Sequence, residues 1–77
     1  MSIEHVCLGR AVRELRGRLD ISQEQFGFRS GLHRNYVGAI ERGEINATFR
    51  TLLAVAHGLE MPLSAIVELY ELRRVEP

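Results

Sequence analysis

Apolar residues recur along this chain at helical spacing, and no run alternates polar and apolar residues well enough to predict a strand. The first helix is predicted over about Val6–Arg18, where apolar side chains spaced by four, three and four residues share one face. Those side chains are Leu8, Val12, Leu15 and Leu19. The pattern therefore predicts an all-α protein.

The second helix has an unusually complete start signal. Ser22 is placed as its N-cap, and Gln25 stands three residues later as the partner of a capping box. Ile21 and Phe26 have the spacing of a hydrophobic staple across this start. Gly31 allows the left-handed backbone that ends a helix, so we expect the second helix between Ser22 and Gly31.

A third short helix is predicted over about Arg34–Arg42. Val37 and Ile40 are expected to turn inward, and Gly43 is expected to close the helix. Gly27, inside the second helix, costs about 1 kcal/mol relative to alanine, so we expect a neighbouring helix to pass close to it. Two short helices joined by a tight turn are the pattern of a helix-turn-helix.

Two further helices complete a compact five-helix domain over residues 1–77. The fourth is predicted over about Phe49–His57, with Thr48 as N-cap and Gly58 as the stop. The fifth is predicted to begin near Pro62 and to run to about residue 74. It is more apolar than one packed face requires, through Leu63, Ile66, Val67, Leu69, Tyr70 and Leu72.

Size and composition narrow the class of protein. A chain of 77 residues holds one modest core, and its single cysteine, Cys7, excludes a disulfide within the chain. The longest apolar run is far short of the roughly 20 residues of a membrane helix. Glu4 and His5 stand where a secretory signal would be apolar, so we expect a cytoplasmic protein with no membrane association.

The sequence offers little for catalysis. The three histidines, at positions 5, 33 and 57, lie far apart and belong to no cluster of metal ligands. The chain has no phosphate-binding glycine loop and no nucleophile elbow. We therefore expect no enzyme activity, no metal site and no cofactor.

Charge is neutral in sum but uneven along the chain. Residues 1–50 contain eight arginines and six acidic residues, whereas residues 51–77 contain two arginines and four acidic residues. This distribution would suit one face for phosphate and another for a partner, although so small an asymmetry is also compatible with chance.

A short exposed helix after a tight turn is the arrangement that enters the major groove of DNA, and the start of the third helix has side chains suited to contact base edges there. Arg34 can donate two hydrogen bonds to guanine, and Asn35 can pair with adenine. His33 and Gly38 would enter the groove beside them. Tyr36 could contact phosphate or a thymine methyl group, or could instead be half-buried packing.

Phosphate contacts are expected on both sides of this helix. Gln23, in the first turn of the second helix, is placed to donate its amide to a phosphate. Arg42 and Asn46 are expected to make a second set of contacts from the following loop. Glu44 is unexpected there, because a carboxylate facing phosphate is repulsive; either it points away or it weakens the phosphate affinity of the loop.

Leu8 through Ile66 resembles the helix-turn-helix domain of the phage repressor and Cro type, also called the Xre family. The resemblance is carried by Leu15–Arg16, Ile21–Glu24, Ser30–Leu32, Arg34–Val37, Ile40–Gly43 and Leu52–Ala56. Within the family, the chain is most similar to small stand-alone regulators such as the controller proteins of restriction-modification systems, which are five-helix dimers.

The resemblance implies that Gln23 contacts phosphate and that a groove-facing row runs along the third helix. This row comprises Arg34, Asn35, Tyr36 and Gly38 or Ala39. The resemblance also implies an ion pair between Arg16 and Glu41 that fixes the tilt of the third helix. Three positions depart from the family pattern, in that His33 replaces a usual Ser, Thr or Asp cap, Ala47 replaces a common proline and Glu60 replaces a frequent glycine.

We therefore expect a sequence-specific regulator that binds double-stranded DNA as a homodimer on a palindromic operator. RNA polymerase is a candidate further partner. The dimer contact is expected on the fifth helix at Leu63, Ile66, Val67, Leu69 and Tyr70, with the end of the fourth helix nearby, unless these residues are used within the core of the domain. An antitoxin-like or adaptor module that holds a partner protein is the alternative function, and zero net charge and Glu44 favour it.

Overall fold

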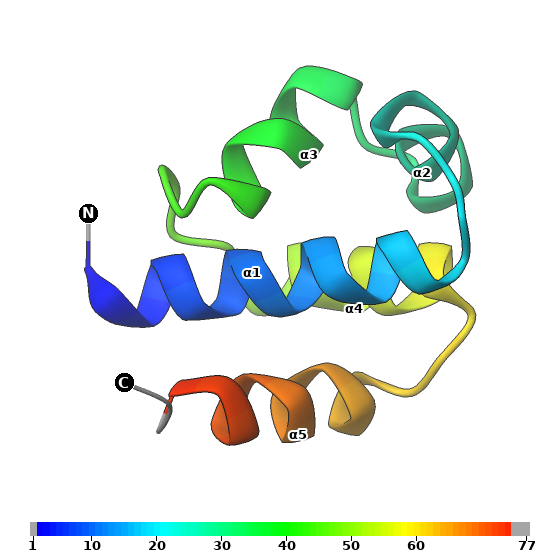
Figure 1. The fold of residues 1–77 in the computed structure, drawn as a ribbon. Helices are drawn as coiled ribbons and strands as arrows, with labels where there is room; N and C mark the ends of the chain where they lie inside the picture. Colours follow the sequence, from blue (N-terminus) through cyan, green and yellow to red (C-terminus); the bar gives the residue numbers. More distant parts are fainter. Residues whose placement is uncertain (1, 75–77) are drawn as a thin grey trace.

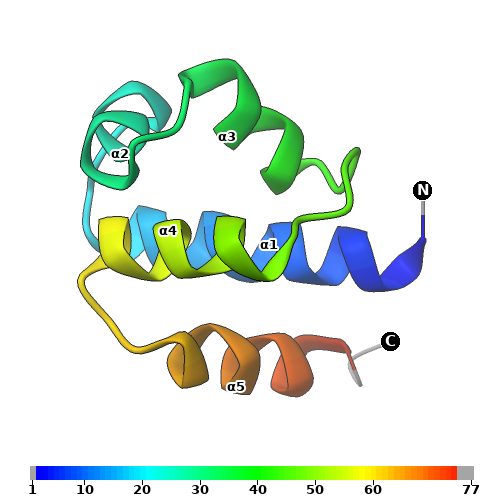
Figure 2. The same ribbon diagram turned by 180° about the vertical axis from the view of Figure 1, so that it is seen from behind.

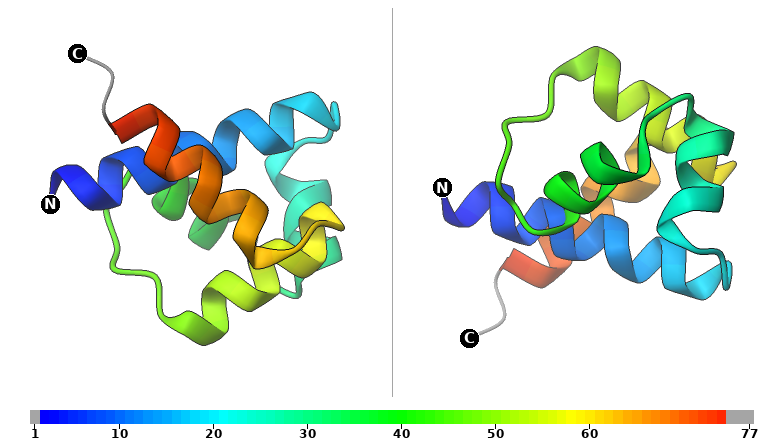
Figure 3. Two further views of the ribbon diagram at one scale, coloured as in Figure 1. Left: turned by 90° about the horizontal axis from the view of Figure 1, so that it is seen from below. Right: turned by 90° about the horizontal axis from the view of Figure 1, so that it is seen from above.

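The computed structural model describes residues 2–74, which form five helices. Their bounds are α1 Ile3–Arg18, α2 Gln23–Ser30, α3 Arg34–Glu41, α4 Phe49–Leu59 and α5 Leu63–Arg74. In Figure 1, α2 and α3 lie above α1 and α4, and α5 lies below them. Seen from below, α5 lies across α1, with which it packs (Figure 3). The predicted all-α, five-helix fold is confirmed.

The core draws apolar side chains from all five helices. Phe26 of α2 is the largest of the fully buried side chains. The cluster around it consists of Ala11, Val12, Leu15, Val37, Ile40, Val55, Ala56, Leu59, Ile66 and Leu69. The inward placement of Val37 and Ile40 is confirmed, and it turns the opposite side of α3 toward solvent. Leu19, expected on the packed face of the first helix, is instead an exposed C-cap.

Two predicted helix ends are wrong. α1 begins at Ile3, three residues before the expected start, because the hydroxyl of Ser2 accepts from the amide of His5 and caps the helix. α4 continues through Gly58 to Leu59. A Cβ on Gly58 would lie 2.8 Å from the ring of Phe26, so this glycine permits close packing of α2 on α4 rather than ending α4.

Glu60 is the residue that caps the C-terminus of α4. Its φ of 56° lies in the left-handed region, which disfavours side chains with a Cβ, and its amide donates to the carbonyls of Ala56 and His57. This conformation accounts for the frequent glycine at this position in the family that the sequence resembles.

The close approach expected at Gly27 is present, but its partner is different. A Cβ there would collide with the carbonyl oxygen of Leu32 and would lie 3.3 Å from the amide nitrogen of Arg34. The backbone of the turn, rather than a neighbouring helix, therefore requires glycine at this position.

No single helix in the described residues is long and apolar enough to cross a membrane. α4 and α5 meet the length and composition criteria only together, and the chain bends by 101° between them. Within residues 2–74, no group of three or more His, Cys, Asp and Glu side chains is placed to hold a metal ion.

Glu14 joins α1 to α5 and is expected to make the fold sensitive to acid. Arg73 donates to its two carboxylate oxygens at 3.0 and 2.9 Å, and Arg18 donates at 2.6 Å. The hydrogen bond from Arg73 is the main cause that lowers the pKa of Glu14 to about 2. Because the pKa is lower in the folded state, this network should stabilise the fold above the ordinary carboxyl pKa of about 4.5 and be lost as the pH falls toward 2.

Urea unfolding between pH 6 and pH 2 checks this expectation. The Glu14→Gln variant should be less stable than the wild type at pH 6, and the difference should shrink as the pH falls below 4.5. Glu68→Gln, on an exposed position of α5, is the matched control and should follow the wild-type profile. Parallel profiles for Glu14→Gln and the wild type would contradict the role of Glu14.

Candidate nucleic-acid interface

Caps fix both ends of α2 and the start of α3. At the start of α2 the predicted capping box is present, since Ser22 and Gln25 each accept from the other's backbone amide. Gly31, with φ 75°, ends α2 in the left-handed conformation, as predicted. His33 caps α3 through its ring, because Nδ1 accepts from the amide of Asn35 at 3.0 Å. This bond requires Nδ1 to be unprotonated and leaves Nε2 for another partner.

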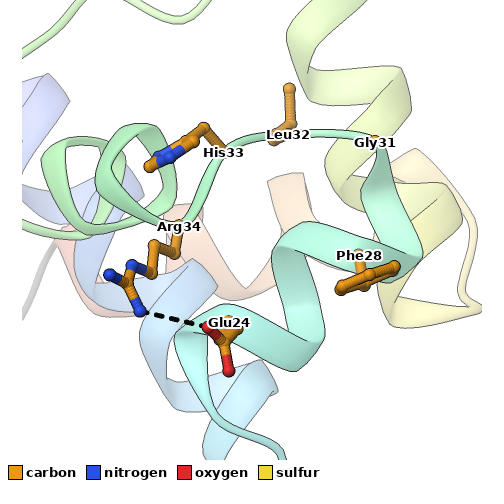
Figure 4. A pocket seen from close by; sticks show the side chains of 6 residues that line it. All are labelled: Glu24, Phe28, Gly31, Leu32, His33 and Arg34. Carbon is orange, nitrogen blue, oxygen red and sulfur yellow. Dashed lines mark hydrogen bonds and ion pairs between the residues drawn. The ribbon is translucent and has the colours of Figure 1, made fainter.

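The predicted base-reading side chains lie at the exposed start of α3. Arg34 and Asn35 are both exposed, and Tyr36 is exposed to a lesser extent. Figure 4 shows Arg34 facing Glu24 of α2, and Arg34 Nη1 lies 3.0 Å from Glu24 Oε2. Both side chains of this pair are about two-thirds exposed, so the pair contributes little stability and can be exchanged for another partner.

Gly38 does not present an open surface to the groove. It is buried, because the side chains of Gln23 and Arg42 lie over it. The prediction that Gly38 itself contacts bases is therefore wrong: above it, Arg42 is exposed and Gln23 is half-buried. Ala39, the other residue predicted in that part of the row, is half-buried.

A buried polar network holds α3 against α1 and α2. Arg16 Nε and Nη2 donate to the two carboxylate oxygens of Glu41 at 2.6 and 3.0 Å. Gln23 Nε2 donates to Glu41 Oε1 at 3.0 Å, and Arg16 also donates to the carbonyl of Ile21. The hydrogen bond to Glu41 raises the pKa of Arg16 above its ordinary value. The ion pair implied by the family resemblance is present, and it ties α3 to both preceding helices.

The loop after α3 is fixed by its own hydrogen bonds. The amide of Gly43 donates to Ile40 and the amide of Glu44 donates to Ala39, which is a Schellman motif with Gly43 at φ 73°. A Cβ on Gly43 would lie 2.7 Å from the Cα of Val6, so the loop also packs tightly on α1. Asn46, predicted to contact phosphate, is exposed in this loop.

Glu44 forms a two-bond ion pair with Arg42. Arg42 Nε donates to Glu44 Oε2 at 2.8 Å, and Nη2 donates to Oε1 at 3.1 Å. The hydrogen bond from Arg42 holds the pKa of Glu44 below its ordinary value, and the same bond raises the pKa of Arg42. The carboxylate is therefore paired within the loop, and the guanidinium of Arg42 offsets its charge.

Two exposed residues, Arg50 and Phe28, were not predicted from sequence. Arg50 lies in the first turn of α4, immediately after a helix start capped by Thr48. An arginine two positions after a threonine N-cap was the signal that could have found it. Phe28 of α2 is 89% exposed and lines a shallow pocket with Glu24, Gly31, Leu32, His33 and Arg34 (Figure 4). No motif or spacing in the sequence marks Phe28 as an exposed residue.

The residues predicted for a dimer contact divide into buried and exposed groups. Ile66 and Leu69 are buried in the protomer core, so they are not available to a partner and this part of the prediction is wrong. Leu63 and Tyr70 are half-buried against the core, and Val67 is 41% exposed. α4 lies above α5 in Figure 2 and meets it at a steep angle, since the chain bends by 101° between them. α4 also carries exposed apolar side chains that were not among the predicted contact residues. These are Phe49 and Leu53, which are 67% and 46% exposed.

Comparison with known proteins agrees with this arrangement. The family model described as "Helix-turn-helix" matches residues 12–66. The control protein C.SmaI of Serratia marcescens is 44% identical over 59 residues, which cover 77% of this chain and 69% of that protein. The immunity repressor protein of Bacillus phage phi105 is 35% identical over 60 residues, covering 78% of this chain and 42% of the repressor.

Solved structures of restriction-modification controller proteins have the same fold. The controller protein C.AhdI from Aeromonas hydrophila superposes with a TM-score of 0.82 and 37% identity, covering 84% of this chain and 98% of that chain. Wild-type C.Esp1396I superposes with a TM-score of 0.92 over 99% of this chain and all of that chain. At 24% sequence identity, this second match is evidence for a shared fold only.

Proposed function

Because the chain belongs to the Xre-type helix-turn-helix family of DNA-binding transcription regulators, we propose that it binds a palindromic operator as a homodimer and acts as a restriction-modification controller protein. The observation that carries this proposal is the exposed polar start of α3, held at a fixed tilt by Arg16, Gln23 and Glu41. The likeness to C.SmaI and C.AhdI supports the controller role. RNA polymerase is a proposed further partner.

In the proposed complex, the start of α3 enters the major groove. Arg34 would exchange its exposed pairing with Glu24 for the O6 and N7 atoms of guanine, and Asn35 would pair with adenine. The ring Nε2 of His33 and the hydroxyl of Tyr36 would donate to phosphate. On either side, the free amide hydrogen of Gln23 and the side chains of Arg42, Asn46 and Arg50 would contact the backbone of the DNA.

The proposed dimer contact is the α4–α5 face, which we define as Phe49, Leu53, Val67 and Tyr70. Phe49 and Leu53 lie one turn apart on α4 and are exposed. Val67 and Tyr70 of α5 line a depression together with Leu52, the neighbour of Leu53. Two copies joined through this face would present two α3 helices to half-sites spaced by about one turn of DNA, roughly 34 Å. Such an arrangement requires a palindromic site.

Arg34 and Gln23 are expected to differ in what they contribute. Arg34→Ala should weaken binding of the dimer to its operator by about 30-fold or more, because one bidentate base contact, worth roughly 1 to 3 kcal/mol, is lost in each of the two half-sites. Binding to random DNA should change much less. Gln23→Ala should weaken binding to both DNAs by similar factors, because phosphate contacts carry no sequence information. Fluorescence anisotropy at fixed salt with the two DNAs measures both. Equal losses on the two DNAs for Arg34→Ala would contradict base readout by Arg34.

A protein-binding module is the second candidate function. Arg34 and Arg42 are each paired with a carboxylate of their own chain, which reduces the positive field that attracts DNA. The exposed ring of Phe28, which lines a pocket together with Arg34, would suit a partner protein. Selection from a pool of random duplexes separates the two functions. Enrichment of one palindromic sequence supports the regulator, whereas no enrichment supports the module.

A further inference from the structure

Arg42 lies across the middle of α3 at Gly38. A Cβ on Gly38 would lie 2.9 Å from Arg42 Nη1, 3.5 Å from Gln23 Oε1 and 3.7 Å from Arg42 Cζ. The guanidinium and the glutamine amide thus occupy the space that a larger side chain at position 38 would fill. A glycine inside a helix is unfavourable relative to alanine, so this position has a packing reason to lack a side chain.

Glu44 orients the guanidinium in this place. Its carboxylate accepts from Nε and Nη2 of Arg42, which leaves the hydrogens of Nη1 on the side of Gly38. The backbone of Glu44 is itself held, because its amide donates to Ala39 in the Schellman motif. Arg42 and Glu44 are about half exposed, so their pairing adds little to the stability of the fold. Its effect is to restrict a long and otherwise flexible side chain.

We propose that Glu44 is a positioning residue for DNA recognition, which holds Arg42 against Gly38 so that Nη1 donates to the DNA beside Gln23. This inference rests on the proposed docking of α3 in the major groove. A free arginine attracts any phosphate, whereas a paired arginine adds almost no net charge but keeps directed donors. Binding also costs less when a long side chain is already ordered. Glu44 therefore lowers the attraction of Arg42 to random DNA and favours the docked operator complex, in which α3 holds Nη1 at one fixed phosphate.

Glu44→Gln distinguishes positioning from simple repulsion. If Glu44 positions Arg42, the ratio of operator affinity to random-DNA affinity should fall by about threefold to tenfold, because random DNA gains attraction while the operator loses an ordered donor. If Glu44 only repels phosphate, both affinities should rise by the same factor and the ratio should stay constant. A constant ratio overturns the proposal.

The effect must pass through Arg42. In an Arg42→Ala background, Glu44→Gln should leave the ratio unchanged, and a fall of the same size there would show that Glu44 acts on its own and would overturn the proposal. Gly38→Ala provides a second test, because its Cβ displaces Nη1 while alanine favours the helix. It should lower the ratio without lowering the melting temperature. The same loss in the Arg42→Ala background would indicate direct contact of position 38 with DNA. It would overturn the proposal that Arg42 is held against Gly38.

A measurement on the protein without DNA distinguishes failure of this inference from failure of the proposed function. In an NMR spectrum without DNA, hydrogen exchange at Arg42 Nε should be slow in the wild type and fast in Glu44→Gln. Fast exchange in the wild type overturns the positioning role even if an operator is found. Slow exchange together with no sequence enriched from random DNA shows instead that the proposed function has failed, and DNA recognition by Arg42 fails with it.

Discussion

Glu41→Ala is expected to lower the free energy of unfolding by about 3 to 5 kcal/mol, the usual cost of removing one partner of a buried ion pair. The side chain of Glu41 is only 3% exposed, and it accepts two hydrogen bonds from Arg16 and one from Gln23. Its removal leaves the guanidinium of Arg16 without its main partner in a site that is 16% exposed. The loss follows mainly from this uncompensated charge.

A loss of this size is large for so small a domain. At the usual 0.05 to 0.15 kcal/mol per residue, 77 residues supply about 4 to 12 kcal/mol in total. The melting temperature should fall on the order of 15–30 °C, which circular dichroism and urea unfolding can measure. DNA binding at low temperature should also weaken, because the tilt of α3 depends on this network.

Two variants control this prediction. Glu24→Ala breaks an ion pair whose side chains are both more than 60% exposed, and it should change stability by less than about 1 kcal/mol. Replacement of both partners, Arg16→Met with Glu41→Leu, should cost less than Glu41→Ala alone, because no buried charge is left unpaired. A change below 1 kcal/mol for Glu41→Ala would contradict the assignment of this pair as a buried support of α3.

Sequence alone predicts the parts of this structure that depend on neighbouring residues. Ser22 with Gln25 and Thr48 cap their helices as predicted, because a cap involves residues only two or three positions apart. Gly31 ends α2 for a similarly local reason. The helix-turn-helix and its exposed start of α3 follow from these signals together with the apolar spacing of the helices.

The errors occur where the outcome depends on tertiary packing. Gly58 looks like a helix stop from its neighbours, but the ring of Phe26, far away in sequence, makes it a packing glycine inside α4. The apolar spacing of α5 does not show that Ile66 is buried and Val67 is exposed, because this depends on how α5 packs across α1. Glu44 was unexplained because its pairing with Arg42 depends on the Schellman turn between them.

Leu53→Glu is expected to abolish the proposed dimer and to weaken operator binding by about 10²-fold to 10⁴-fold, the gain that linking two half-site contacts normally provides. Leu53 is 46% exposed on the α4–α5 face, so a carboxylate there is solvated in the monomer but would be buried without a partner in the dimer. Sedimentation equilibrium should show a monomer, and circular dichroism should show unchanged helix content. Anisotropy with one half-site should show little change.

Phe28→Glu is the matched control for oligomeric state, because it places the same charge on an exposed apolar residue of α2, outside the α4–α5 face. It should sediment as the wild type does. A charge at Ile66 would be a poor test, since that side chain is fully buried and its replacement would unfold the protomer. Because the two α3 helices reach successive grooves only when joined, a Leu53→Glu variant that remains dimeric and binds the operator as the wild type does would place the dimer contact elsewhere on the molecule.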